Sequence, residues 1–136
     1  MGKIKVVHAM TDVTGFGLLG HLIEMAEGSG LSATLHYTKV PVLAAAKEYL
    51  AQRIVPDATY RNWNSYSSKT AFAPGVNVME AFSILPDPQT NGGLLIAVSR
   101  DAVAEVQGAF ADHGLANFIE PIGVMTKASD KVITVE

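Results

Sequence analysis

The residues of this sequence best suited to chemistry lie in one stretch near its start, Thr11-Asp12-Val13-Thr14-Gly15-Phe16-Gly17-Leu18-Leu19-Gly20-His21. Its single carboxylate, Asp12, falls where a predicted strand ends and a predicted helix begins. A carboxylate at such a turn can hold Mg²⁺, a hard cation that prefers oxygen ligands and bridges phosphates. The alternative is structural, with the side chain of Asp12 or Thr14 capping the helix. Judged on spacing alone, capping is the commoner role.

Two short elements must position this turn. Val6 and Val7 begin a β-prone run that ends near Met10. After the turn, apolar residues recur at helical spacing, at Phe16, Leu19, Leu22, Ile23 and Ala26. Each of the three glycines in this stretch weakens a helix interior by roughly 1 kcal/mol relative to alanine. We therefore expect either a close approach of another backbone or φ values that only glycine tolerates.

The remaining pattern predicts an α+β fold. We expect a strand over 31–38, a helix from Pro41 to about Arg53, an irregular loop from Val55 to Gly75 and a short helix over 78–85. The apolar run 94–98 is typical of a central strand covered on both faces. Ser99 is the expected N-cap of another helix, and strands around 122–124 and 132–135 close the chain, joined by a turn. The prediction is a single domain, residues 1–136, with helices packed on a mixed β-sheet.

The composition of the sequence argues against several classes of function. The 136 residues carry a net charge of −3, without the basic patch that nucleic-acid binding needs. No apolar run approaches the ~20 residues that cross a bilayer, and no signal-peptide pattern opens the sequence. The absence of cysteine excludes disulfides and thiolate chemistry within this chain. We expect a cytoplasmic protein that binds neither nucleic acid nor membrane.

Other polar residues give weaker signals. The four histidines show no metal-ligand spacing, and His21 is expected to be a hydrogen-bonded residue on the helix surface. The segment Asp87-Pro88-Gln89-Thr90-Asn91-Gly92-Gly93 could offer backbone N–H groups to an anion, but without P-loop spacing a structural turn is the preferred interpretation. Around Arg61 and Asn62, we expect an ordered loop pinned by aromatic residues, with an interface or lid as the second interpretation.

Three of these motifs together resemble one known family. The Thr11–His21 stretch is similar to the signature that opens the C-terminal domain of selenophosphate synthetases (selenide, water dikinases), within the aminoimidazole ribonucleotide synthetase-like superfamily. The segment 87–95 resembles the family's Asp-Pro-Gln-Thr-Ser-Gly-Gly-Leu-Leu, with Asn91 in place of serine. The segment 59–62 resembles its Thr-x-Arg-Asn, although Asp57-Ala58 replaces the usual Gly-Gly. The resemblance covers the chain from about His8 to its end.

The resemblance implies a C-terminal domain of an enzyme that makes selenophosphate from selenide and ATP, with AMP and phosphate as the other products. Such enzymes supply selenoprotein and selenium-modified tRNA synthesis. Asp12 matches a family aspartate that binds Mg²⁺ together with aspartates of an N-terminal ATP-binding domain. That domain, with its reactive Cys or selenocysteine and its lysine, is expected to be missing here, and the full-length protein is expected to be a homodimer. The fragment alone should be inactive and contain no catalytic residue, and its nucleotide contacts stay unassigned.

Two other interpretations stay open. Another member of the superfamily, of the purine-biosynthetic, thiamine-phosphate or hydrogenase-maturation type, would share the fold and the ATP chemistry. Alternatively, the chain could be a stand-alone binding or regulatory module without a catalytic role. The aspartate of the first motif and the Asp-Pro-Gln-Thr segment favour the selenium branch.

Overall fold

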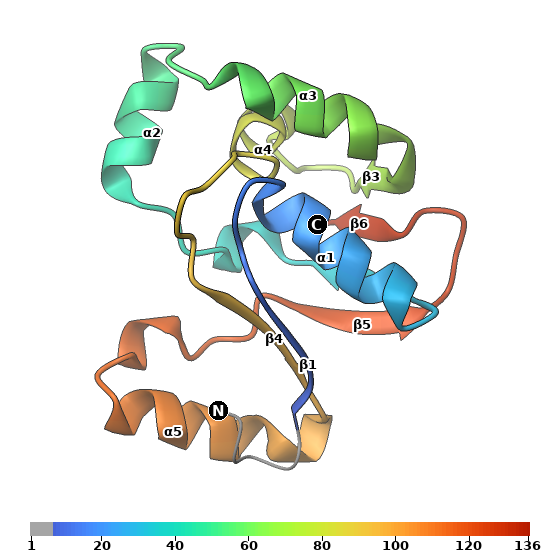
Figure 1. Cartoon of the computed structure of the whole chain (residues 1–136), viewed down its shortest axis with the longest axis vertical. Helices are drawn as coiled ribbons and strands as arrows, with labels where there is room; N and C mark the ends of the chain where they lie inside the picture. Colours follow the sequence, from blue (N-terminus) through green and yellow to red (C-terminus); the bar gives the residue numbers. More distant parts are fainter. Residues whose placement is uncertain (1–6) are drawn as a thin grey trace.

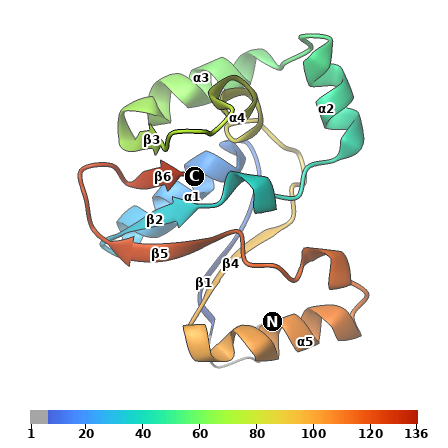
Figure 2. The ribbon, with the colours of Figure 1, turned by 180° about the vertical axis from the view of Figure 1, so that it is seen from behind.

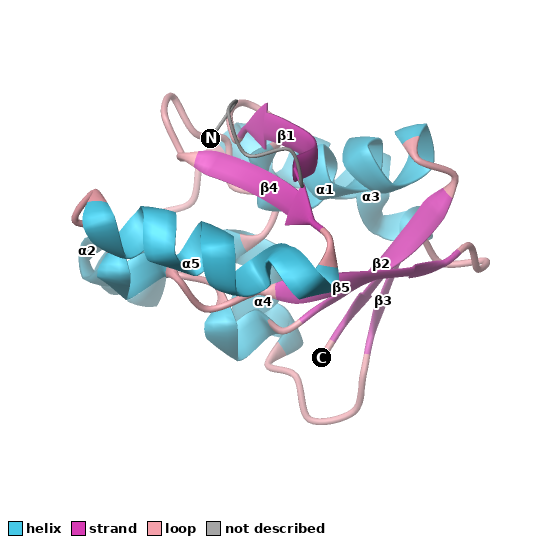
Figure 3. Ribbon diagram, turned by 90° about the horizontal axis from the view of Figure 1, so that it is seen from below, coloured by secondary structure: helices cyan, strands magenta, loops and turns pink. Residues whose placement is uncertain are grey.

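The strands form two separate sheets, which the computed structural model describes for residues 7–136. A two-stranded antiparallel ribbon pairs β1 (Val7–Asp12) with β4 (Leu94–Val98). A four-stranded sheet has the order β3 (Thr70–Phe72), β6 (Ile133–Val135), β2 (Leu31–Leu35), β5 (Gly123–Lys127). Figure 3 shows the ribbon lying apart from this sheet. Val6, predicted to begin the first strand, lies outside the described residues.

The larger sheet is mixed, as predicted. β6 runs parallel to both β2 and β3, whereas β5 runs antiparallel to β2. The two predicted closing strands are present, but they do not pair with each other. They lie on opposite sides of β2, so the turn between them carries the chain across the end of that strand. The combination of a mixed sheet with separate helices confirms the predicted α+β class.

Five α-helices are found in the described part of the chain: α1 (Gly17–Gly28), α2 (Ala44–Ala51), α3 (Asp57–Tyr66), α4 (Val78–Ile84) and α5 (Val103–Asp112). Short 3₁₀ turns occur at Tyr37–Lys39, Ser67–Lys69, Arg100–Ala102 and Ala116–Phe118. Helices α2, α3 and α4 gather at one end of the molecule, and α5 lies at the other end of the ribbon (Figures 1 and 2). In residues 7–136, none of these helices has the length and apolar character needed to cross a membrane.

Helix α1 provides one side of the core. Its apolar stripe faces β2 and the ribbon, and four of the five residues predicted for that stripe are buried: Leu19, Leu22, Ile23 and Ala26. From the sheet side, Leu35, Ile133 and Val135 are fully buried. Phe16 is the exception, because it precedes the helix and its side chain is 47% exposed. The helix therefore anchors the turn that carries Asp12 directly to the core.

The prediction for α2 was wrong at its start. The helix begins at Ala44, and the backbone at Leu43 is still extended. Val40 and Val42 are β-branched and favour extended backbone, whereas the following Ala44-Ala45-Ala46 run consists of the strongest helix formers. The apolar side chains of this segment do not enter the core, since Leu43 and Tyr49 are exposed and no α2 residue is buried.

The predicted irregular loop from Val55 to Gly75 was also wrong, because it contains α3 and β3. Pro56 occupies the N-cap position, and Asp57 supplies a carboxylate to the first turn, where it interacts favourably with the helix dipole. Trp63 packs against Phe82 and Phe72, with ring centroids 5.1 Å and 5.7 Å away. Trp63 therefore holds this otherwise polar helix against α4 and β3.

Strand β4 is not the doubly covered central strand that its apolar run predicted. Within the described residues it pairs only with β1, and Leu94 is 60% exposed while its neighbour Leu95 is buried. Alternate side chains of a strand point to opposite faces. One face of the ribbon therefore packs on the core of this chain, and the other face is open.

Candidate functional site

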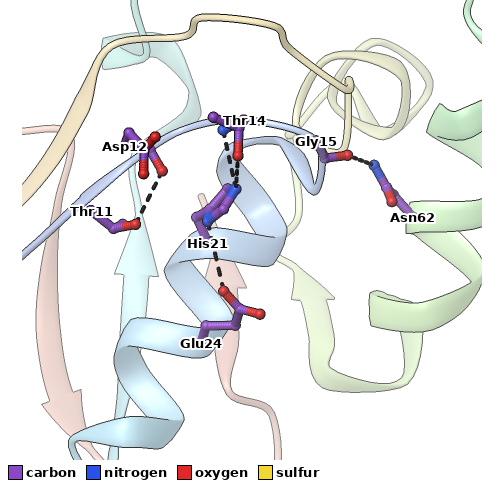
Figure 4. A network of polar contacts seen from close by, with 7 residues as sticks. All are labelled: Thr11, Asp12, Thr14, Gly15, His21, Glu24 and Asn62. Carbon is purple, nitrogen blue, oxygen red and sulfur yellow. Dashed lines mark hydrogen bonds and ion pairs between the residues drawn. The ribbon is translucent and has the colours of Figure 1, made fainter.

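Asp12 is the last residue of β1, and its side chain is exposed on the open face of the ribbon. It pairs with Leu94 across the strands. Thr11 donates its hydroxyl to the backbone carbonyl of Asp12 at 3.1 Å, not to the carboxylate. Among residues 7–136, no side chain or backbone group forms a hydrogen bond or ion pair with the Asp12 carboxylate. Figure 4 shows this side chain at the start of the turn.

The predicted capping role is wrong for both candidates. The N-cap position of α1 is Phe16, and no side chain caps the helix there. The Thr14 hydroxyl instead lies 3.2 Å from His21 Nε2, and the Thr14 carbonyl accepts the Gly17 N–H at 3.0 Å. The structure thus removes the structural explanation for Asp12.

His21 holds this turn from inside α1. Its side chain is buried, with 7% of its surface exposed, and its Nε2 accepts the backbone N–H of Thr14 at 3.1 Å (Figure 4). An imidazole whose Nε2 accepts a hydrogen bond carries its proton on Nδ1, which lies 3.7 Å from a Glu24 carboxylate oxygen. The expected surface histidine is hydrogen-bonded, as predicted, but it is buried.

The Asp87–Gly93 segment lies directly against the same turn. Val13 donates its N–H to the Gly93 carbonyl at 2.9 Å, and Gly92 donates to the Val13 carbonyl at 2.9 Å. The backbone N–H of Gln89 donates to the carbonyl of Thr14 at 3.1 Å. Two N–H groups of the segment are therefore used to hold the turn. These bonds favour the structural interpretation of this segment over an anion cradle.

Asn62 of α3 joins the third motif to the other two. Its side-chain amide donates to the Gly15 carbonyl at 2.8 Å and to the Pro86 carbonyl at 2.9 Å. Sequence reasoning missed this role, since it placed Asn62 in a loop. The structure therefore brings all three predicted motifs together around the residues that follow Asp12.

The glycines confirm the predicted close approach at two positions. Gly17 has φ +69°, and a Cβ there would lie 2.6 Å from the Pro86 backbone carbon. A Cβ on Gly20 would lie 2.7 Å from the Tyr66 ring. Helix α1 therefore packs tightly against both α3 and the loop after α4, and this contact needs glycine.

A complete metal site is not found in the described residues. No group of three or more His, Cys, Asp or Glu side chains in residues 7–136 is placed to hold a metal ion. Asp12 alone does fit a hard cation, because its carboxylate is exposed and free of competing bonds. Mg²⁺ keeps several waters and is bound through one or two carboxylates together with substrate phosphates. The chain can thus contribute one ligand of such a site.

Asp87, beside the turn, provides a test by pH. Burial raises the pKa of its carboxyl above the usual value. Ionisation therefore costs more in the folded state than in the unfolded state; this penalty grows as pH rises from the unfolded pKa to the folded pKa and is constant above it. We expect Asp87→Asn to raise the free energy of unfolding at pH 7, with the gain vanishing near pH 3, below the unfolded pKa of about 3.9. Urea unfolding at both pH values measures this, and an equal gain at both would contradict it.

Comparison with known proteins identifies the fold family. A family described as "AIR synthase related protein, C-terminal domain" matches residues 2–136. The chain belongs to this family. The match covers the AIR synthase related domain from the first strand to the last, including all three motifs around Asp12.

Several curated proteins similar to this chain share the name selenide, water dikinase. The chain is 50% identical over 122 residues to a selenide, water dikinase of Bordetella bronchiseptica, covering 90% of this chain and 34% of that protein. It is 46% identical to a selenide, water dikinase of Yersinia pestis over 98% of this chain and 36% of that protein. The corresponding values for Pseudomonas aeruginosa are 46%, 98% and 37%. The chain thus spans about a third of these curated relatives.

Proposed function

We propose that the chain is the C-terminal domain of a selenide, water dikinase, which converts ATP, selenide and water to selenophosphate, AMP and phosphate. The observation that carries the proposal is the 45–50% identity to proteins of that name over most of this chain. The clustering of the three motifs around the Asp12 turn supports it, because residues far apart in sequence gather around one exposed carboxylate. Residues 1–136 form one domain in this proposal.

Asp12 supplies one ligand of a Mg²⁺ ion in the proposed enzyme. When bound, Mg²⁺ neutralises and bridges phosphate oxygens during phosphoryl transfer. The chain's own part is to present the carboxylate in a fixed direction. The pairing of β1 with β4 fixes the backbone on one side of Asp12, and the bonds to Val13 and Thr14 fix it on the other.

The remaining ligands come from an ATP-binding domain in the part of the enzyme that this chain does not span. The open face of the ribbon supports this, since Met10 (46% exposed) and Leu94 lie beside Asp12 on it. Large apolar side chains on an open strand face are typical of a surface that another part of a protein covers. The full-length enzyme is a homodimer in this proposal. The enzyme acts in the cytoplasm in this proposal.

The proposal is tested by comparing the full-length protein with the isolated chain. We expect the full-length protein to consume ATP only with selenide, and ³¹P NMR to detect selenophosphate with AMP and phosphate in equal amounts. We expect the isolated chain neither to hydrolyse ATP nor to bind Mg²⁺–ATP tightly, because it offers a single carboxylate. ATP consumption by the full-length protein without selenide would favour another activity of the superfamily. A micromolar dissociation constant of the isolated chain for Mg²⁺–ATP, measured by calorimetry, would contradict the assignment of the missing ligands.

A further inference from the structure

Asn62 makes two hydrogen bonds that no other group in the described structure replaces. Its Nδ2 lies 2.8 Å from the Gly15 carbonyl and 2.9 Å from the Pro86 carbonyl. Within residues 7–136, neither carbonyl accepts a backbone N–H. Both partners are carbonyl oxygens, which can only accept, so the NH₂ group of the amide, which has two N–H bonds, must face them.

The position of Asn62 is itself fixed. It lies on α3, where the neighbouring Trp63 packs edge-on against Phe82 and tilted against Phe72. Thr59, one turn earlier, is fully buried. A side chain presented from a packed helix holds its partners more tightly than one presented from a loop. Figure 4 shows Asn62 reaching from α3 to the turn that follows Asp12.

The two carbonyls belong to the two segments that set the direction of the Asp12 side chain. Gly15 is in the turn between Asp12 and α1, and Pro86 begins the segment whose Gln89 and Gly92 bond to that turn. Pro86 is fully buried. Removing the donor would leave its buried carbonyl without a hydrogen-bond partner, which is energetically costly. Relief of that cost would require the turn and the segment to move apart.

We infer that Asn62 is a positioning residue: its side-chain amide clamps the Gly15 turn to Pro86 and thereby fixes the direction in which Asp12 presents its carboxylate to Mg²⁺. The inference rests on the proposed role of Asp12 as a metal ligand. Groups hydrogen-bonded directly to a metal ligand typically change metal affinity by 10–100-fold when they are replaced. Asn62 acts one step further away, through the backbone that follows Asp12, so we expect an effect at the lower end of that range.

The test uses Asn62→Leu in the full-length protein, since leucine has a similar size and donates no hydrogen bond. Asn64→Leu is the matched control, because Asn64 is exposed on the same helix and its side chain makes no hydrogen bond within the described residues. Tyr37→Phe is the control for a general effect of losing a side-chain hydrogen bond. It removes a 2.7 Å bond to Glu80, which joins elements away from the Asp12 turn. Asn62→Ser, which keeps one donor, serves if Asn62→Leu folds poorly.

Two quantities are measured well below each melting temperature. The first is the affinity for Mn²⁺, used as a probe for Mg²⁺, from water-proton relaxation with a non-hydrolysable ATP analogue present. The second is amide hydrogen exchange at Gly17 and Gln89, which both donate to the Thr14 carbonyl. For Asn62→Leu we expect Mn²⁺ affinity to fall by about tenfold and both amides to exchange faster. Asn62→Ser should lie between this variant and the wild type, and both controls should match the wild type.

The outcomes separate the positioning role from the proposed function. A folded Asn62→Leu protein with wild-type Mn²⁺ affinity would overturn the inference, provided that Asp12→Asn weakens Mn²⁺ binding in the same assay. Unchanged exchange at Gly17 and Gln89 would overturn it regardless of the metal. If Asp12→Asn leaves Mn²⁺ affinity unchanged, the metal assignment of Asp12 fails, and the exchange rates alone decide whether Asn62 holds the turn.

Discussion

Replacing Asp12 by asparagine in the full-length protein is expected to lower selenide-dependent ATP consumption by orders of magnitude. Asparagine keeps the size of the side chain but removes the negative charge that a Mg²⁺ ligand supplies. Phosphoryl transfer depends mainly on positioning and on neutralising charge, so on the proposed role of Asp12 the loss of its carboxylate affects the reaction directly. Partial recovery at raised Mg²⁺ would identify the defect as metal binding.

The same substitution is expected to leave stability nearly unchanged. The Asp12 carboxylate is exposed and has no partner within residues 7–136, and substitutions of that kind usually change the free energy of unfolding by less than about 0.5 kcal/mol. Asp130→Asn, an exposed aspartate in the turn before β6, is the matched control and should retain full activity. Activity and melting temperature are measured on the same samples. Near-normal turnover by Asp12→Asn would remove Asp12 from the metal site.

The sequence was sufficient to predict the part of the site that is local in the chain. A β-prone run, a turn with closely spaced glycines and a helical apolar stripe predicted β1, the turn and α1. Those signals act over a few residues, through side-chain alternation and helical periodicity. The positive φ of Gly17 follows the same logic, since a glycine in a predicted turn is a common site for it.

The sequence contains a signal for helix α3 itself, but none for the hydrogen bonds that Asn62 makes from it. Tyr60, Trp63 and Tyr66 recur at a spacing of three residues after Pro56 and Asp57, a helix-start signal that the polar composition obscured. The bond from Asn62 to Gly15 spans 47 residues. Such a contact depends on how α3 packs against α1 and α4, and no local pattern encodes that packing.

Strand β4 illustrates a different limit. A continuous apolar run indicates that both faces of a strand become covered, but it does not indicate which polypeptide segment covers them. In residues 7–136, only the Leu95 face is buried by this chain. This chain spans about a third of the relatives it matches. That agrees with the proposal above, in which another part of the enzyme covers the open face of β4.

Gly17→Ala is expected to cause the largest loss of stability among the glycine substitutions in the turn. Alanine at φ +69° is strained by about 1–2 kcal/mol. In addition, its Cβ would meet the Leu85 carbonyl oxygen at 2.7 Å and the Pro86 backbone at 2.6 Å, so that backbone must shift. Overpacking of a tight contact adds about 1–3 kcal/mol. The total loss should be about 2–5 kcal/mol in the free energy of unfolding.

Gly15→Ala provides the matched control two residues earlier in the same turn. A Cβ on Gly15 would meet no atom within 4 Å, and its φ is not in the left-handed region. We therefore expect this variant to unfold within about 0.5 kcal/mol of the wild type. Urea unfolding of the isolated chain, followed by the fluorescence of its single tryptophan, Trp63, measures both variants. Because Trp63 lies on α3 and Gly17 begins α1, a lowered midpoint for Gly17→Ala would report loss of the packing between these elements. Equal midpoints for the two variants would show that the turn and the Pro86 backbone can separate without cost, and that the contact does not fix the geometry around Asp12.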